Sequence, residues 1–134
     1  MSYFDHEKLD VYRVAIQLNV LVEEVVEQLP RGRSYLADQL HRAGTSVPLN
    51  IAEGAGEYTG NEKARFYRIA MRSAIECAAI FDLCQELKLI QESHYRQGRE
   101  LLLRIVATLI KMAQGCSANS IGHAHAHAHV RGNE

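Results

Sequence analysis

The sequence predicts an all-α protein, an antiparallel up-down-up-down four-helix bundle. Three observations lead to this fold class. Hydrophobic residues make up 47% of the 134 residues, while the chain has only two prolines. These hydrophobic residues recur at spacings of three and four, which is the period of a helix with one apolar face. Short segments separate four such stretches, and short connections place consecutive helices antiparallel.

The first helix is expected from about Asp5 to Leu29. Its apolar positions are spaced alternately by four and three residues, as in coiled-coil packing. The tripeptide Pro30-Arg31-Gly32 then ends the helix, because Pro and Gly disfavour its continuation. The predicted core positions are Val11, Ala15, Leu18, Val22, Val25 and Leu29.

The second helix is expected to begin near Ser34, a favourable N-cap residue, and to run toward Gly54 and Gly56. Pro48 lies inside this stretch. A proline ring presses on the carbonyl four residues earlier, here that of Gly44. The small residues around that position favour one continuous, kinked helix over two short helices that break at Pro48.

The third helix begins with the clearest signal, Thr59-Gly60-Asn61-Glu62. This is a capping box, in which the Thr hydroxyl and the Glu carboxylate satisfy backbone donors. The fourth helix is expected from about Glu92 to Gln114, with Gly115 ending it. The predicted core positions are Phe66, Ala70, Ser73, Cys77, Ile80, Cys84 and Leu87 in the third helix, and Tyr95, Leu102, Val106, Leu109 and Ala113 in the fourth.

The bundle should therefore occupy residues 1–115, followed by a disordered His-rich tail over 116–134. Histidines alternate with alanines from His123 to His129. This pattern reads as a purification tag or a flexible tail with incidental metal affinity, while chelation of a divalent metal is the alternative. The three cysteines lack metal-type spacing. We therefore expect no resident metal and no cofactor.

Charge and hydropathy bound the location and the partners. No apolar run approaches the roughly 18–20 residues of a membrane span, and the first residues do not resemble a signal peptide, so a cytoplasmic protein without membrane contact is expected. Residues 1–30 hold six acidic and two basic side chains, whereas residues 31–114 hold nine and twelve. This asymmetry favours head-to-tail self-assembly or a locally basic face over a generally basic nucleic-acid binder.

Two helices carry more apolar surface than a lone bundle can bury. The first helix has a second stripe that points away from its core positions, and the fourth is apolar over roughly 200° of its circumference. Coherent surplus stripes mark interfaces, so a homo-oligomer is predicted. The expected interface residues are Leu9, Tyr12, Ile16 and Val20 in the first helix and Leu101, Ile105 and Met112 in the fourth, with Leu103 and Ile110 on the opposite flank of the fourth.

Polar residues gather on the second and third helices. We interpret them as a buried, hydrogen-bonded layer that fixes helix register, with Arg42 pairing with Glu53 or Glu76. The alternative is a ligand or catalytic pocket in the core. A di-iron site is excluded, because no Glu is followed by His three residues later. The layer comprises Gln39, Arg42, Ser46, Asn50, Glu53, Ser73 and Glu76.

A basic stripe runs along the third helix, away from its core positions. Arg65, Arg68 and Arg72 fall within about 60° of one another, with Lys63 nearby. Such a stripe can contact phosphates, and it predicts weak, sequence-tolerant binding of RNA or DNA. The alternative is a solvated helix face that nearby glutamates partly neutralise.

Four runs of sequence resemble the bacterial four helix bundle protein family, which includes proteins encoded in intervening sequences of large-subunit ribosomal RNA genes. The resemblance covers about residues 4–113, and the Asn-Ile-Ala-Glu-Gly run is its most specific part. It implies an antiparallel four-helix bundle that assembles as a homopentamer. The runs are Gln39-Leu40-His41-Arg42-Ala43, Ser46-Val47-Pro48-Leu49-Asn50-Ile51-Ala52-Glu53-Gly54, Phe66-Tyr67-Arg68-Ile69-Ala70 and Ser73-Ala74-Ile75-Glu76.

A relative of that family, the accessory variability protein of diversity-generating retroelements, is similar in fold. The resemblance extends to that relative, which binds nucleic acid and a reverse transcriptase through a strongly basic surface. This chain departs from it, with a formal net charge of −1.

The leading hypothesis is a non-enzymatic, self-assembling bundle that serves as an accessory or scaffold in a nucleic-acid-related process. The second is a protein-interaction scaffold without nucleic-acid contact. The third is a small-molecule enzyme that uses Arg42, Glu53 and Glu76. We expect no small-molecule substrate under the first two.

Overall fold

The computed structural model describes the backbone of residues 4–133 and the side chains of residues 4–117. A short 3-10 helix, η1 (Asp5–Lys8), precedes four α-helices, and the described backbone contains no strand. The predicted all-α, four-helix fold is confirmed. The four helices are α1 (Asp10–Gln28), α2 (Ser34–Ala55), α3 (Gly60–Glu86) and α4 (Glu92–Asn133).

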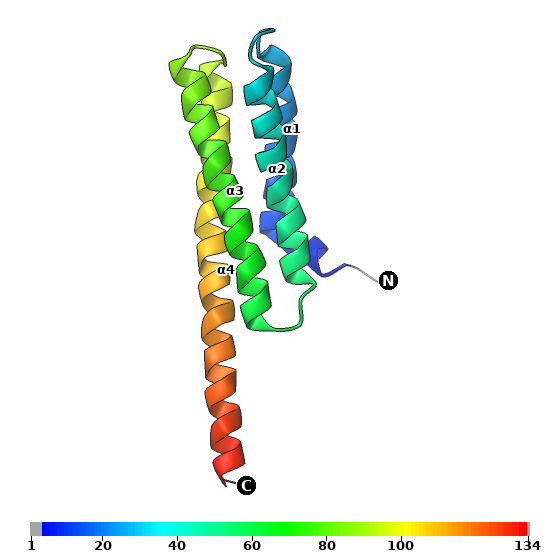
Figure 1. Cartoon of the computed structure of the whole chain (residues 1–134), viewed down its shortest axis with the longest axis vertical. Helices are drawn as coiled ribbons and strands as arrows, with labels where there is room; N and C mark the ends of the chain where they lie inside the picture. Colours follow the sequence, from blue (N-terminus) through cyan, green and yellow to red (C-terminus); the bar gives the residue numbers. More distant parts are fainter. Residues whose placement is uncertain (1–3, 134) are drawn as a thin grey trace.

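Each helix packs against the two neighbours that lie beside it, in the cyclic order α1, α2, α3, α4 (Figure 1). Pairs of contacts show the relative directions. Asn19 of α1 donates to the carbonyl of Gly44 at 2.8 Å, and Glu23, one turn later, lies 3.6 Å from His41, which comes earlier in α2. Helices α1 and α2 are therefore antiparallel. The colours of Figure 1 follow the same reversal through α3 and α4.

The core lies along the centre of the bundle and receives apolar side chains from all four helices. The predicted α1 positions are buried, with Leu29 at the edge of the core. The largest fully buried side chains come from every helix, so no pair of helices forms a separate core. They include Leu18, Leu21, Leu36, Leu40, Ile51, Phe81, Ile105 and Leu109.

Two helix starts can be compared directly with expectation. The Thr59 hydroxyl accepts a hydrogen bond from the Glu62 backbone N–H at 3.1 Å, which confirms the predicted cap of α3. The first helix does not begin at Asp5. The chain makes the η1 turn instead, and Leu9 is extended, with φ −95° and ψ 121°, before α1 starts at Asp10.

Pro48 lies inside a continuous α2, and the alternative of two short helices is wrong. Pro48 has no N–H to donate to the carbonyl of Gly44, four positions earlier, and that carbonyl accepts instead from Asn19 Nδ2 of α1 at 2.8 Å. Both Pro48 and Gly44 are buried, so tertiary packing holds this part of the helix in place. The run that carries the family resemblance is thus helical throughout.

The expected end of the fourth helix at Gly115 is also wrong. Helix α4 continues through Gly115, Cys116 and Ser117. Most of the expected disordered tail over 116–134 lies outside the residues whose side chains the structure describes, so that expectation stays a prediction. A single glycine costs a helix only about 1 kcal/mol relative to Ala, so Gly115 by itself is a weak stop signal. The side chains of the alternating histidines lie outside the described residues.

Helix α3 turns slightly different residues inward from those expected. Tyr67 and Phe81 are buried, whereas Phe66 is half-buried and Leu87 is exposed. Both buried rings rest on glycines of neighbouring helices. A Cβ on Gly98 of α4 would lie 2.4 Å from Phe81 Cε1, and one on Gly54 of α2 would lie 2.6 Å from Tyr67 Cε1. The helices approach closely at these two points because the glycines have no side chain.

Candidate interaction surfaces

One apolar surface runs along the outside of α1 and reaches α4. Ile16 and Val20 have 42% and 58% of their surface exposed. Leu9 and Tyr12 are half-buried and pack against the edge of the core, as do Leu101 and Met112 of α4. Val20 and Leu101 line the same shallow depression, together with Gln17, Leu21, Glu24 and Gln97. The structure thus brings the two predicted stripes together there. We call Leu9, Tyr12, Ile16, Val20, Leu101 and Met112 the α1–α4 face.

Ile105 does not belong to this face, and its predicted outward position is wrong. The side chain is fully buried, with 0% exposure, between the core residues Leu102 and Leu109. The predicted core line passed through Val106 instead, which is half-buried. At ~100° per residue the two positions differ by one step around the helix. An apolar arc as wide as that of α4 does not indicate which part faces the core.

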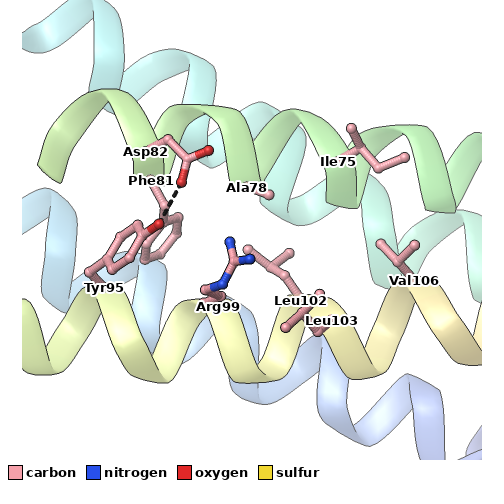
Figure 2. A pocket seen from close by; sticks show the side chains of 9 residues that line it. All are labelled: Ile75, Ala78, Phe81, Asp82, Tyr95, Arg99, Leu102, Leu103 and Val106. Carbon is pink, nitrogen blue, oxygen red and sulfur yellow. Dashed lines mark hydrogen bonds between the residues drawn. The ribbon is translucent and has the colours of Figure 1, made fainter. Parts of the chain in front are cut away.

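A second apolar surface lies between α3 and α4 and forms a groove of about 170 Å³ (Figure 2). Ile75 of α3 and Leu103 of α4 stand on its two sides and are 50% and 58% exposed. The sequence indicated the flank of α4 that holds Leu103 but gave no signal for a groove. The lining residues are Ile75, Ala78, Phe81, Asp82, Tyr95, Arg99, Leu102, Leu103 and Val106. We call this feature the α3–α4 groove.

The polar groups of the α3–α4 groove gather at one end. The Tyr95 hydroxyl donates a hydrogen bond to Asp82 Oδ1 at 2.7 Å, and Arg99 reaches from α4 toward α3 beside this pair (Figure 2). The hydrogen bond to Asp82 raises the pKa of Tyr95 above its ordinary value, so the phenol stays protonated and continues to donate. The groove is thus an apolar trough with a polar end.

The predicted polar layer divides into an inner and an outer part. Three of its members meet between α2 and α3. The Ser73 hydroxyl donates to Ser46 Oγ at 2.8 Å, and Asn50 Nδ2 donates to the Ser46 carbonyl at 2.8 Å and to Ser46 Oγ at 2.9 Å. All three are half-buried. This serine–asparagine cluster joins the two helices.

The four remaining members of the predicted layer lie on the surface, so their predicted burial is wrong. Gln39, Arg42, Glu53 and Glu76 are all exposed. None of the ion pairs among the described side chains joins Arg42 to Glu53 or Glu76. Water solvates charged groups more effectively than an apolar core does, so long charged side chains at the edge of a seam turn outward. A convergent charged site in the core is not formed.

The three arginines of the basic stripe are exposed on α3, as expected, but two of them have partners. Arg65 lies 3.4 Å from Glu62 and stacks over the Phe66 ring at 4.8 Å. Arg68 donates to Ser117 Oγ of α4 at 2.9 Å. Arg72 completes the stripe.

Lys63 has a different position from the arginines. Its ammonium group donates to the carbonyls of Ala55 at 2.8 Å and Gly54 at 3.3 Å, at the end of α2. Carbonyls in the last turn of a helix lack intrahelical partners, and a cation there also interacts favourably with the helix dipole. Lys63 therefore caps α2 and does not extend the stripe.

The two buried cysteines of α3 are poor candidates for a reactive site. Burial raises the pKa of Cys77 to about 12, and it also raises that of Cys84, which keeps both thiols protonated and poorly nucleophilic. The described side chains contain no group of three or more His, Cys, Asp or Glu residues that could hold a metal ion. No helix among the described residues is long and apolar enough to cross a membrane.

The comparisons with known proteins concern nearly the whole bundle. A model of the 23S rRNA-intervening sequence protein family matches residues 7–111. Among solved structures, the chain is similar to a protein of unknown function from the S23 ribosomal protein family of Bacteroides thetaiotaomicron. The two chains are 20% identical, the match covers 77% of this chain and 97% of that one, and the TM-score is 0.71. No curated protein matches the chain.

Proposed function

The chain belongs to the 23S rRNA-intervening sequence protein family, which confirms the resemblance drawn from its motifs, and from this premise we propose a non-enzymatic role built on self-assembly. Copies of the bundle associate into a ring, a pentamer as the resemblance implies. The ring acts as an accessory or scaffold in a nucleic-acid-related process. It works in the cytoplasm and takes no small-molecule substrate.

The observation that carries this proposal is the α1–α4 face. Ile16 and Val20 are large aliphatic side chains that the bundle leaves exposed, and they lie beside further apolar side chains from both helices. Transfer of apolar surface out of water contributes roughly 25 cal/mol per Å². Contiguous apolar patches rimmed by polar residues are typical of protein interfaces. In a homo-oligomer, the partner that covers the α1–α4 face is a second copy of the chain.

The nucleic-acid part of the proposal depends on the arginines of α3. Arg72, and the exposed parts of Arg65 and Arg68, can contact phosphates. Assembly would repeat the stripe in every subunit and strengthen the local field. The outer surface of α1 opposes this with exposed Glu23, Glu24 and Glu27. The acidic helix favours the alternative proposal, a protein scaffold without nucleic-acid contact.

The assembly proposal can be tested by light scattering coupled to size exclusion. Wild type should have a mass several times the 15.1 kDa of one chain. Val20→Glu should dissociate the assembly, because it places a charge in the middle of the α1–α4 face while leaving helical circular dichroism unchanged. Ile105→Glu is unsuitable for this test, since Ile105 is part of the core.

Gln17→Glu is the matched control. It adds the same charge to the same depression, but it removes no apolar contact because Gln17 is already polar and exposed. It should remain largely assembled. A wild-type chain that is monomeric at micromolar concentration would overturn the proposal.

A further inference from the structure

We propose, on the basis of the self-assembly above, that the α3–α4 groove receives the outer face of α1 from a neighbouring copy. The contact would be head-to-tail, between two different surfaces of the chain. A contact of this kind joins each copy to two neighbours and closes into a ring when the rotation allows. The partner of the groove is therefore a second copy of this chain, and its ligand is the apolar ridge of α1.

The side chains of the two surfaces can interdigitate. Ile16 and Val20, four residues apart on α1, form a ridge in the sense used for helix packing and have about half of their area exposed. Val20 also borders the shallow depression that it shares with Leu101. The groove is concave and almost entirely apolar along the side chains between Ile75 and Leu103. Its volume of about 170 Å³ resembles the roughly 150 Å³ apolar cavity that accommodates a benzene molecule. Space of this size suits aliphatic side chains of the Ile16–Val20 type.

The charges at the ends of the two surfaces are also complementary. Glu27 follows Val20 by seven residues, and Arg96 precedes Leu103 by seven residues. Seven residues are two helical turns, or ~10 Å of rise in both cases. When two copies point in the same direction and Val20 faces Leu103, Glu27 therefore lies level with Arg96. Both side chains are exposed. Arg99 and the acidic Asp82 lie together at this end of the groove, so the alignment depends on the pairing of Glu27 with Arg96.

A two-fold contact between two copies of α1 explains less. It would cover Ile16 and Val20 but would leave Ile75 and Leu103 in water on both copies. The two surfaces lie on different sides of α4, which packs against α1 on one side and α3 on the other (Figure 1). The head-to-tail contact covers both surfaces at once and leaves every subunit of a closed ring equivalent.

Two blocking variants test the proposal together. Val20→Glu disables the ridge but keeps the groove, whereas Leu103→Glu disables the groove but keeps the ridge. Both positions are 58% exposed in the single chain, so neither change threatens the fold. Each variant alone should be monomeric by light scattering. An equimolar mixture should form a dimer that contains one chain of each variant, because one ridge and one groove remain intact. Native mass spectrometry with one variant isotope-labelled identifies that species.

The control is Leu49→Glu, which places the same charge at an exposed leucine of α2 and should assemble like wild type. If Leu103→Glu also assembles like wild type, the groove is not part of the contact and the inference is wrong while self-assembly stands. If both variants are monomeric and their mixture stays monomeric, the head-to-tail pairing is wrong. A monomeric wild type would overturn the proposed function as well, so the two failures are distinguishable.

Reversing the charges of Glu27 and Arg96 tests the alignment of the two copies. Glu27→Arg should weaken assembly by opposing Arg96, and adding Arg96→Glu should restore at least half of the lost assembled fraction. Arg96 also lies 3.1 Å from Glu92 of its own helix, so Arg96→Glu alone is measured for reference. A double variant as weak as Glu27→Arg would overturn the parallel alignment.

Discussion

Gly98 and Gly54 lie where aromatic rings of α3 touch the backbone of neighbouring helices. At Gly98 the Phe81 ring occupies the space that a Cβ would need, and at Gly54 the Tyr67 ring does so. Neither glycine has a positive φ. Their role is therefore close packing and not backbone conformation. Gly54 ends the Asn-Ile-Ala-Glu-Gly run, so close packing against the Tyr67 ring explains the glycine of that motif.

Gly98→Ala should destabilise the bundle, because the Phe81 ring must move to admit the new methyl group. Overpacking of this kind costs about 1–3 kcal/mol, more than the roughly 1 kcal/mol that the better helix propensity of Ala returns. Gly115→Ala is the matched control, since a Cβ there meets no atom within 4 Å. It should be neutral or stabilising. Urea unfolding followed by circular dichroism measures both variants, and equal effects would contradict the packing explanation.

At the residue scale, the sequence predicted the regularly spaced core positions better than it predicted the direction of individual side chains. The α1 core positions follow directly from their spacing. Ile105 was misplaced because α4 is apolar over so wide an arc that Ile105 and Val106 fit the pattern equally well. Lys63 was grouped with the arginines because the spacing of residues within α3 does not show that its ammonium group donates to a carbonyl of α2. Such a contact depends on how one helix end meets the next, which periodicity does not describe.

The serine–asparagine cluster couples α2 to α3 near the middle of the bundle. Ser46 accepts from Ser73 across the helix pair and from Asn50 within α2. Ser46 precedes Pro48 by two residues in the same helix. The cluster therefore supplies directional bonds in a part of α2 where the proline has removed one backbone donor.

Asn50→Ala should lower the free energy of unfolding by about 1–2 kcal/mol, because two hydrogen bonds are lost and the Ser46 oxygens are left with fewer donors. Thr45→Ala is the control: its hydroxyl bonds only to the Arg42 carbonyl in the same helix, at 3.2 Å, and is exposed. A double-mutant cycle of Asn50→Ala with Ser73→Ala measures the coupling within the cluster. Additive effects would show that the three side chains act independently.

At the scale of the helix, boundaries set by local interactions were the easiest to predict. The Thr59 cap is a local interaction between residues three apart, so the sequence contains all of it. The small residues around Gly44 favoured a continuous α2 at Pro48, but the burial of this segment and the bond from Asn19 to the Gly44 carbonyl could not be read from the sequence. The end of α4 was predicted from Gly115, which is a weak stop signal when no proline follows it.

Binding of nucleic acid is a property of the whole molecule, because phosphate contacts from several subunits would add together. For wild type, affinity for a DNA duplex and for a structured RNA should be weak and fall steeply with salt, by about 0.9 log units per log unit of salt for each DNA phosphate contacted. Arg65→Ala/Arg68→Ala/Arg72→Ala should abolish it or flatten that slope.

The matched control, Arg31→Ala/Arg42→Ala/Arg104→Ala, removes the same charge from other exposed positions. It should bind more tightly than the α3 triple variant. Absence of binding by wild type at low salt, or equal loss in both variants, would remove the α3 stripe from the proposed function and leave the protein scaffold.

The four-helix bundle and the α1–α4 face could be anticipated, because both follow from apolar periodicity within single helices. The α3–α4 groove could not. Ile75 and Leu103 lie in different helices, and they stand on two sides of one trough only once α3 and α4 pair. The polar layer was overestimated for a related reason. Helical spacing placed Arg42, Glu53 and Glu76 near the seam but could not show that their charged ends reach solvent.

Helix α3 is fixed at two separate points along its length, and this has a mechanical consequence. Tyr67 rests on α2 and Phe81 rests on α4, and the two rings are fourteen residues, or ~21 Å, apart. Sliding α3 by one turn would drive both rings from their glycines into positions that carry side chains. The Tyr67–Gly54 contact therefore opposes sliding of α3 along α2, and the Phe81–Gly98 contact opposes sliding of α3 along α4, so the two sides of the α3–α4 groove keep their relative register.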